Sequence, residues 1–357
     1  INSYTTDPNY AYISTIDEIG ANEWAMDKII NDHLSGQSYY FENSKSFLNA
    51  PGEWYFDKNA KKIYYMLQIG SAINDTFIIP KVERLLEING ASYIRFENLT
   101  FEHSTWLMGI RDGIGTQASG HYYHNYEGKD PDWASDFIPS AINIANSSNV
   151  IFNSCKFQHL GGGAIEIDKA THDNIIEKCV ITDCAANGIT IKGDPKNSTN
   201  YCTNNIIRDN VIFKVAQEYT QCVGIFGKFP VANTIENNEL FDMPYTGISI
   251  GWGWPYGDPT IPDKSTSLRD NVIRRNDIHH VQQLHQDGGG IYTLRDQPGT
   301  LITENWIHDI QPSFWMLQPL GQYPVYGIYL DELSDHMSVL SNVCSNVLKD
   351  INTHYRY

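Results

Sequence analysis

A strand-length motif that recurs along most of the chain constrains the fold more than any other feature of the sequence. The motif is a glycine followed by alternating apolar residues, as in Gly188-Ile189-Thr190-Ile191, Gly224-Ile225-Phe226, Gly247-Ile248-Ser249-Ile250, Gly290-Ile291-Tyr292 and Gly327-Ile328-Tyr329-Leu330. Each run is about 3–5 residues long and rich in β-branched residues, which favours a strand over a helix. A repeated unit of this kind predicts a solenoid in which stacked coils share one core.

Asparagine marks two further positions in each unit, ahead of other short apolar runs. Examples are Asn205-Ile206-Ile207, Asn271-Val272-Ile273, Asn210-Val211-Ile212, Asn238-Glu239-Leu240 and Asn276-Asp277-Ile278. Each unit therefore carries three short strands separated by polar turns. Asn suits the bends because it tolerates the left-handed α conformation and can form hydrogen bonds along a ladder of coils.

Three strands per unit, stacked coil on coil, predict an all-β parallel β-helix. Alternation places Ile189 and Ile191 in the core and Thr190 outside. Gly224 and Gly247 are 23 residues apart, close to a bare coil, whereas Gly247 and Gly290 are 43 apart. The longer coils must carry loops at one turn, and such a rim is usually the binding face. A β-sandwich is the alternative, but sandwiches do not repeat Gly-Ile-x-Ile in register.

The repeat predicts a solenoid over residues 86–357, and residues 1–85 lie outside it. A hairpin signal in the first segment, Trp54-Tyr55-Phe56, a polar turn and Ile63-Tyr64-Tyr65, indicates a small β-rich N-terminal subdomain packed on the solenoid. Three long loops, rich in aromatic residues, interrupt the repeat at 102–140, 252–266 and 311–324. Irregular loops of this length are usually functional when they are ordered.

Charge and hydropathy exclude several classes of partner. A net charge of −17 argues against nucleic acid, which needs a basic surface. No apolar run reaches the roughly 18 residues of a membrane span, so we expect no membrane insertion. The chain opens at Ile1 without Met or a signal peptide and ends without a polar cap. We therefore expect it to be processed or trimmed, with sequence missing on both sides.

The six cysteines are expected to be free thiols. Cys155 and Cys179 occupy the same place in consecutive coils, which predicts a stacked interior position where Cys acts as a small hydrophobe. Because the sequence contains no CxxC pair, we expect no zinc site and assign no metal ligands.

Aromatic loops beside a long solenoid suit a chain polymer such as a polysaccharide. Trp252 and Trp254 follow a strand directly and are held by Gly and Pro, so we interpret them as sugar-stacking platforms. A hydrophobic plug that anchors the loop is the alternative, and Trp106 has the same ambiguity. Sugar hydroxyls also require polar partners. The full set of expected substrate-binding residues is Trp252, Trp254, His285, Tyr292, Tyr329, Glu332, Trp106 and Gln117.

Two carboxylates in consecutive coils are the expected catalytic residues. Asp287 precedes the run Gly288-Gly289-Gly290, where glycine allows close approach of a ligand. Asp331 has the outward parity of its strand, because Ile328 points inward and Tyr329 outward. Two carboxylates that flank one bond are the minimum equipment for glycoside hydrolysis. The alternative is that Asp287 is only a turn residue and Asp331 only a charge on the surface.

Other acidic and histidine residues are weaker candidates. Glu166 and Asp168 face outward but lie five coils earlier than Asp331, roughly 24 Å away at the spacing of stacked strands. They could therefore hold only a distal sugar. Glu332 is a fallback for Asp331, and His285, two residues before Asp287, is the histidine most suited to contact substrate.

Several motifs resemble those of carbohydrate enzymes with a right-handed parallel β-helix, most closely glycoside hydrolase family 141. They are Pro51-Gly52-Glu53-Trp54-Tyr55-Phe56-Asp57, Phe96-Glu97-Asn98-Leu99-Thr100-Phe101-Glu102-His103, Ile250-Gly251-Trp252-Gly253-Trp254, Asp287-Gly288-Gly289-Gly290-Ile291-Tyr292 and Tyr329-Leu330-Asp331-Glu332. The resemblance runs from about residue 50 to the end. It implies an α-L-fucosidase or xylanase type of activity, with Asp287 and Asp331 at the positions of the two aspartates implicated in that family.

Three functions therefore remain in view. The first is a secreted glycoside hydrolase, extracellular or periplasmic, that acts on plant or microbial polysaccharide (a xylan- or fucose-containing glycan) without a cofactor. The second is a polysaccharide lyase, which must neutralise a uronate, with Ca²⁺ or basic residues, and abstract a proton; Lys192 and Lys228 occupy equivalent strand ends. The third is a non-catalytic carbohydrate-binding solenoid, which needs the aromatic loops but not the paired carboxylates.

Overall fold

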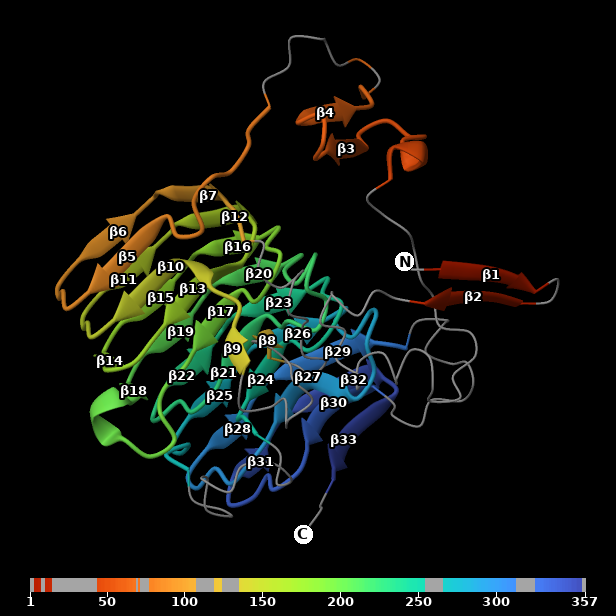
Figure 1. The fold of residues 1–357 in the computed structure, drawn as a ribbon. Coiled ribbons are helices and arrows are strands. Elements are labelled where there is room, and N and C mark those ends of the chain that lie inside the picture. The colour runs from red at the N-terminus through yellow and green to blue at the C-terminus, as the bar shows by residue number, and fades with distance from the viewer. Residues whose placement is uncertain are drawn as a thin grey trace. The chain divides into compact units, whose positions relative to one another are not determined.

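The computed structural model describes residues 3–7, 10–14, 44–68, 70, 77–106, 119–123, 135–253, 266–312 and 325–354. The chain divides into two compact units: Ser35–Ile79, and a larger unit that joins Ile1–Leu34 to Pro80–Tyr357. Strands form almost all the regular structure (Figure 1). No helix among the described residues is long and apolar enough to cross a membrane.

The smaller unit contains the hairpin that the sequence predicts. Strand β3 (Trp54–Asp57) pairs antiparallel with β4 (Lys62–Tyr65), so that Tyr55 faces Tyr64 across the hairpin. A single 3₁₀ turn, η1 (Lys45–Phe47), precedes it and is capped by the Ser44 side chain. In the larger unit, β1 (Ser3–Asp7) and β2 (Tyr10–Ser14) form a separate antiparallel pair.

Three parallel sheets make up the larger unit, and each coil contributes one strand to each sheet. The first sheet contains β5 (Leu86–Asn89), β10 (Ser140–Ala145), β13 (Gly163–Ile167), β17 (Ile189–Ile191), β21 (Ile225–Gly227), β24 (Ile248–Ile250), β27 (Gly288–Thr293), β30 (Val325–Leu330) and β33 (Lys349–Thr353). The second contains β6 (Arg95–Glu97), β11 (Ile151–Asn153), β15 (Ile175–Glu177), β19 (Ile206–Arg208), β22 (Thr234–Glu236), β25 (Val272–Arg274), β28 (Leu301–Thr303) and β31 (Ser338–Leu340). The third contains β7 (Thr100–Ser104), β12 (Lys156–Leu160), β16 (Val180–Thr182), β20 (Val211–Phe213), β23 (Glu239–Phe241), β26 (Asp277–His279), β29 (Trp306–Ile310) and β32 (Val343–Val347).

The remaining short elements lie at the turns. They are β14 (Thr171–His172), which pairs with β18 (Cys202–Thr203), the 3₁₀ turn η2 (Ser198–Asn200), and the antiparallel pair β8 (His121–Tyr123) and β9 (Ser135–Phe137). This arrangement confirms the predicted parallel β-helix.

Stacked aliphatic residues fill the interior of the coil. On the first sheet Ile225 pairs with Ile248, which pairs with Ile291 and then Ile328, and all four are fully buried. Each buried isoleucine stabilises the fold by roughly 1.5–3 kcal/mol relative to an exposed one. The core therefore depends on keeping every strand in the same register, because a slip of one residue would turn this row outward.

The predicted cysteine stack is confirmed. Lys156 pairs with Val180, which places Cys155 against Cys179 in the next coil, and both are buried free thiols. Burial raises the pKa of Cys179 to about 12, so it remains a protonated thiol that packs as an apolar group.

Two rows of asparagine side chains hold successive coils together. In the longer row Asn210 Nδ2 donates to Asn238 Oδ1 at 2.9 Å, Asn238 Nδ2 to Asn276 Oδ1 at 3.0 Å, and Asn276 Nδ2 to Asn305 Oδ1 at 2.9 Å. Each asparagine also donates to a backbone carbonyl of the preceding coil, as Asn238 does to Ile207 at 3.0 Å. The predicted ladder is thus confirmed.

The left-handed bend itself falls one residue before the ladder asparagine. Asp209, Asn237 and Arg275 have φ between 53° and 56°, whereas Asn210, Asn238 and Asn276 are not among the residues with positive φ. The prediction that the ladder asparagines adopt the left-handed conformation is therefore wrong. Their preceding neighbours bend the chain, and the asparagines supply the hydrogen bonds.

The outer face of the first sheet is covered by the β8–β9 pair. The Asn187 side chain donates to the Ser119 carbonyl at 2.7 Å, and the Phe137 ring stacks on outward-facing Phe226 at 5.2 Å. His121 on β8 lies under this cover, 1% exposed, with its ring 4.6 Å from that of Trp252. Burial, and secondarily the charge of Lys228, lowers the pKa of His121 to about 3.

We expect Asn238→Asp to destabilise the protein by about 3–5 kcal/mol, as for an uncompensated buried charge. The second carboxylate oxygen would face two acceptors, the Ile207 carbonyl and Asn276 Oδ1. Guanidinium denaturation followed by circular dichroism measures the change. The matched control is Asn237→Asp at the exposed neighbouring position, which should change stability by under about 0.5 kcal/mol. Equal effects of the two substitutions would contradict the ladder.

The buried neutral His121 predicts a loss of stability in acid. Its pKa is about 3 in the folded chain and 6.5 in the unfolded chain, so between these values the unfolded chain binds the extra proton. The stabilising contribution is fully present above pH 6.5 and is lost as the pH falls toward 3. We expect His121→Gln to flatten this dependence by up to about 1.4 kcal/mol per pH unit, measured as denaturant midpoints against pH. Parallel curves for wild type and variant would contradict the assignment.

Candidate active site

Polar and aromatic side chains on the outer face of the first sheet are buried. In register order the outward residues are Glu87, Asn143, Glu166, Thr190, Phe226, Ser249, Tyr292, Tyr329 and Asn352. From Asn143 to Tyr329 each is at most 5% exposed. Outward residues of the second sheet, such as Arg208, are only half-buried.

Asp331 follows β30 directly and lies at the C-terminal end of this face. Its side chain is 6% exposed. The Tyr292 hydroxyl donates to Asp331 Oδ2 at 2.5 Å, and His354 Nδ1 lies 2.9 Å from Asp331 Oδ1. Tyr292 comes from the coil before and His354 from the coil after, so three successive coils fix one carboxylate. A buried carboxylate requires such partners.

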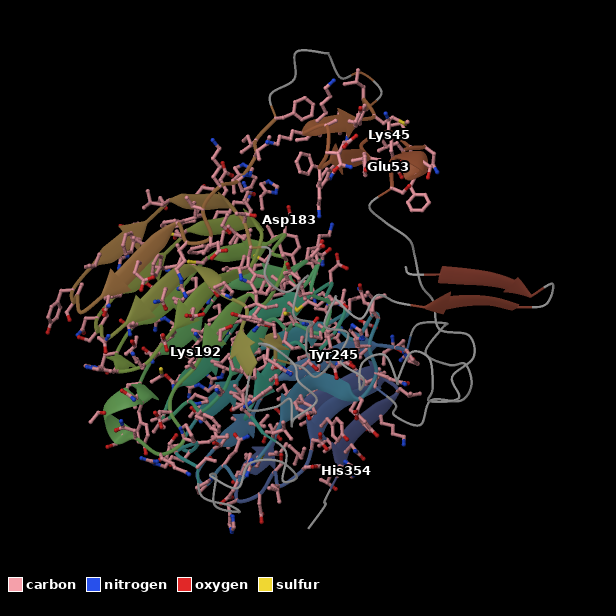
Figure 2. All side chains as sticks on the ribbon, viewed as in Figure 1. Lys45, Glu53, Asp183, Lys192, Tyr245 and His354 are labelled. Atoms are coloured by element: carbon pink, nitrogen blue, oxygen red, sulfur yellow. The ribbon has the colours of Figure 1, made fainter. Side chains whose placement is uncertain are left out.

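Asp287 lies in the turn that leads into β27, one coil before Asp331. Its backbone is left-handed, with φ of 65°, and its side chain is half-buried. The Tyr245 hydroxyl donates to the Asp287 carbonyl at 2.9 Å. This contact fixes the backbone of the turn and therefore the point from which the Asp287 side chain projects. Figure 2 labels Tyr245, which contacts Asp287, and His354, which contacts Asp331.

Both aspartates act on one cluster of tyrosines. Burial raises the pKa of Tyr245, Tyr292, Tyr326 and Tyr329, and the negative charges of Asp287 and Asp331 raise each of them further. The Tyr292 and Tyr329 rings meet edge-on at 5.4 Å, and those of Tyr326 and Tyr329 lie 4.8 Å apart. The charges of both aspartates therefore act on the same tyrosines, and these phenols remain protonated donors at neutral pH.

The glycines after Asp287 are required by the protein's own packing. A Cβ on Gly288 would collide with the side chains of Gln282, Thr246 and Tyr245, and one on Gly290 would press on Ile307 and on the carbonyl of Gly327. All three glycines are buried in β27. These glycines therefore allow close contact between neighbouring parts of the protein, and their expected role in admitting a ligand stays a prediction.

His285 borders the tyrosine cluster, and Glu332 follows Asp331 directly in the chain. The His285 ring meets Tyr245 edge-on at 5.1 Å, and its Nε2 lies 2.8 Å from Thr220 Oγ1. Glu332 is 5% exposed, and its carbonyl accepts a hydrogen bond from the backbone of Arg295 at 3.1 Å. Arg295 Nε in turn donates to the Gly253 carbonyl at 2.7 Å, which ties the start of the 252–266 loop to the site.

Two of the tryptophans predicted to bind sugar, Trp252 and Trp106, pack into the protein. Trp252 is 3% exposed and meets His121 and Phe137 edge-on at 4.6 and 5.2 Å. Trp106 is 4% exposed and meets Tyr122 and Tyr219 at 5.0 and 5.2 Å. This packing favours the alternative in which these residues anchor loops. The other two predicted binding residues, Trp254 and Gln117, lie outside the described residues.

Sequence reasoning missed His354, Tyr245 and Tyr326. His354 follows β33 just as Asp331 follows β30, since Tyr329 pairs with Asn352, so an alignment of the last two coils would have found it. Tyr245 precedes its strand, in a turn with no repeating pattern. Tyr326 lies on β30 but before the glycine that defines the motif, where the repeat predicts no outward position.

The earlier carboxylate Glu166 belongs to a separate ionic cluster. It is fully buried, with Lys192 Nζ 3.0 Å and an Arg84 guanidinium nitrogen 3.4 Å from its Oε1. Five register steps separate it from Tyr329, roughly 24 Å at 4.8 Å per step. It is too far from Asp331 to share one glycosidic bond.

Two protein-family models match the chain. The model described as a right-handed β-helix region matches residues 84–256, and the model of the GH141 insertion domain matches residues 20–68. No curated protein matches the sequence. The second model matches a part of the chain that precedes the solenoid.

Several solved structures are similar to this chain. A glycoside hydrolase is 25% identical, with a TM-score of 0.72, and the match covers 88% of this chain and 57% of that one. The chain therefore spans just over half the length of that enzyme. A complex of XylC with xylose is 17% identical over 65% of this chain and 41% of that one, with a TM-score of 0.38. An alginate lyase from Paenibacillus sp. str. FPU-7 is 10% identical over 75% and 92%, with a TM-score of 0.37.

The β-helix model, the insertion-domain model and the glycoside hydrolase structure agree with the resemblance found in the motifs. This chain is a right-handed parallel β-helix of the kind found in glycoside hydrolase family 141.

Proposed function

We propose that this protein is a glycoside hydrolase whose catalytic carboxylates are Asp287 and Asp331. One observation carries the proposal: Asp331 is buried, held by Tyr292 and His354, and shares a tyrosine cluster with Asp287. Cleavage of a glycosidic bond requires a pair of carboxylates, and these two lie on adjacent coils. The likeness to a glycoside hydrolase structure supports the same chemistry.

The surroundings of the two carboxylates suggest different roles. Contacts on both carboxylate oxygens hold Asp331 in place, and we assign it as nucleophile or general base. Asp287 is half-buried at a turn and is assigned as the acid. In the reaction Asp287 protonates the glycosidic oxygen as its bond to the anomeric carbon breaks. In the same step Asp331 either takes a proton from the water that attacks this carbon or attacks the carbon itself. In the second case an ester forms, and a water molecule deprotonated by Asp287 then hydrolyses it.

The tyrosine cluster and its neighbours provide the substrate contacts in this proposal. Tyr292 and Tyr329 retain their protons, because burial and the two aspartates raise the pKa of each hydroxyl. They can therefore donate hydrogen bonds to sugar oxygens or to Asp331. His285, which contacts Tyr245, and Glu332, which follows Asp331, complete the set of described binding candidates.

The proposed substrate is an oligo- or polysaccharide of plant or microbial origin, containing xylose or fucose. The family resemblance supports these two sugars, and a secreted location follows from a substrate of this size. No cofactor is needed, since proton transfer and displacement at the anomeric carbon require only the two carboxylates.

The lyase alternative has less support from the geometry. Its basic candidates are Lys192, whose Nζ pairs with Glu166 at 3.0 Å, and Lys228, whose Nζ lies 4.9 Å from the Phe137 ring centre. Both belong to coils well before the one that carries Asp331. A non-catalytic binding solenoid would not need a buried carboxylate fixed by two donors.

We expect Asp287→Asn and Asp331→Asn each to reduce kcat by about 10²–10⁴-fold, the range for loss of general acid or base catalysis. Reducing-sugar release from a polysaccharide panel, with aryl-α-L-fucoside and aryl-β-xyloside, measures the loss. Asp335→Asn is the matched control, because this aspartate lies near Asp331 in the chain but its side chain is 65% exposed. It should retain wild-type activity.

Two outcomes would contradict this assignment. If both Asn variants turn over substrate at the wild-type rate, the carboxylates lie elsewhere. If wild type binds glycans but releases no reducing sugar, the binding solenoid is favoured, and an unsaturated product absorbing in the ultraviolet would indicate a lyase. The configuration of the first product, followed by NMR, then distinguishes a nucleophilic Asp331 from a general base.

We expect Tyr292→Phe to lower kcat more than it raises KM. The variant removes the hydroxyl that donates to Asp331 Oδ2 at 2.5 Å and so loosens the position of this carboxylate. Tyr326→Phe is the control, because Tyr326 lies in the same cluster but makes no hydrogen bond to Asp331 among the described contacts. A wild-type kcat in Tyr292→Phe, or an equal loss of kcat in Tyr326→Phe, would refute the positioning role.

A further inference from the structure

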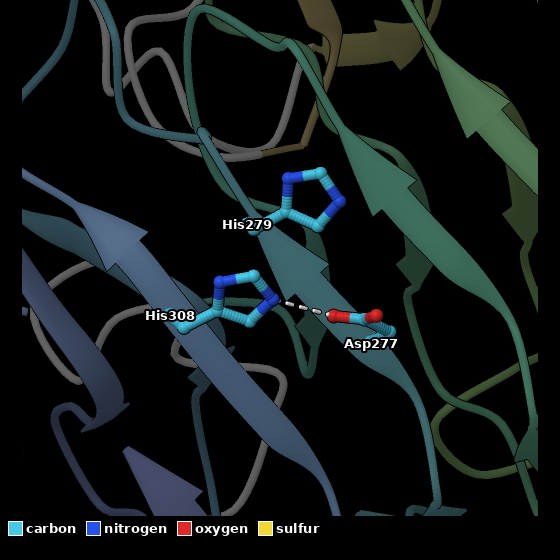
Figure 3. A group of neighbouring side chains, drawn as sticks. All are labelled: Asp277, His279 and His308. Carbon is cyan, nitrogen blue, oxygen red and sulfur yellow. Dashed lines mark hydrogen bonds and ion pairs between the residues drawn. The ribbon is translucent and has the colours of Figure 1, made fainter. Parts of the chain in front are cut away.

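A second group of chemically competent side chains lies on the third sheet, away from the aspartate pair on the first. Asp277 and His279 project from β26, and His308 projects from β29 in the next coil. One ligand atom from each residue lies within 4.8 Å of the other two (Figure 3). We propose that Asp277, His279 and His308 form a binding site for a transition-metal dication of the zinc type.

The contacts of His308 leave its Nε2 in position to bind a metal ion. Its Nδ1 lies 2.7 Å from Asp309 Oδ2, and its Nε2 lies 2.9 Å from Asp277 Oδ1. When Nδ1–H donates to Asp309, a neutral ring presents the Nε2 lone pair to the Asp277 carboxylate. Two acceptors then face each other, an arrangement that a cation between them would relieve. A carboxylate behind the ligating histidine is the usual support of a zinc site.

Stacking fixes the orientation of both imidazoles. The His279 ring lies between those of Phe241 and His308, at 5.0 and 4.9 Å, and Trp306 stacks on His308 at 3.8 Å. The histidine side chains are 17% and 13% exposed, whereas that of Asp277 is 38% exposed. The rings are thus held in place, while the carboxylate edge of the cluster remains accessible to an ion from solvent.

A fourth ligand is available from the preceding coil. Glu239 pairs in register with Asp277, and its Oε1 lies 3.6 Å from His279 Nε2. Two imidazoles with one or two carboxylates match the ligand preference of Zn²⁺, with water able to complete the shell. Ca²⁺ and Mg²⁺ prefer oxygen ligands and suit this set poorly. A bound ion would link β23, β26 and β29, three consecutive coils.

The sequence alone does not reveal this cluster because its ligands come from different coils. His308 and Asp277 are 31 residues apart, and the spacing matches none of the short motifs by which zinc sites are found. The competing explanation is a doubly protonated His308 that bridges Asp277 and Asp309 without any ion. Metal-binding measurements separate the two explanations.

The test is equilibrium dialysis of the chelator-treated protein against Zn²⁺ at neutral pH, with metal counted per folded chain. Wild type should bind one equivalent more than His308→Gln, and its melting temperature should rise with Zn²⁺ where that of the variant does not. His172→Gln is the matched control, since His172 is 50% exposed and pairs with its neighbour Asp173. It should bind as wild type does.

Two further measurements keep the proposal falsifiable if His308→Gln folds poorly. Asp309→Asn keeps all three ligands and should bind Zn²⁺ about 10–100-fold more weakly, as expected when a partner behind the ligand is lost. Co²⁺ should give visible d–d bands in wild type and in His172→Gln that disappear in Asp277→Asn. Equal Zn²⁺ stoichiometry and affinity in wild type and all cluster variants would overturn the proposal, as would the absence of Zn²⁺ binding by folded wild type.

Discussion

Strict register between neighbouring coils is the constraint on which this structure depends. Each strand pairs with the equivalent strand of the next coil, residue for residue, and the asparagine rows repeat the same alignment at the turns. Interior isoleucines meet only because of this alignment. Outward residues are brought together by the same means: Tyr292, Asp331 and His354 come from three coils, and Asp277 and His308 from two. The fold and both sites thus rest on one set of backbone hydrogen bonds.

The periodic part of the structure could be predicted from the sequence. Alternation and the recurring Gly-Ile motif identified the parallel β-helix, and the equivalent placement of Cys155 and Cys179 identified their stack. Parity also placed Asp331 on the outer face. These predictions succeeded because a residue's place in a repeat determines both its direction and its neighbours.

Features without periodicity could not be predicted. Burial of Trp252 depends on the β8–β9 pair, which is distant in sequence, so composition alone suggested an exposed platform instead. The contact of Tyr245 with the Asp287 carbonyl arises in an irregular turn. The bend next to each ladder asparagine was misassigned by one residue, because propensity identifies a turn more reliably than the position within it.

Because the strands set the register, the length of a loop does not affect the geometry of the sheet beside it. Consecutive glycines of the motif can be 23 or 43 residues apart, yet Ile248 still pairs with Ile291 and Ser249 with Tyr292. Whole segments can therefore be exchanged at the rim while a carboxylate one coil away keeps its position to within a hydrogen bond. A scaffold of this kind allows the recognition of a polymer to diversify independently of the chemistry performed on it.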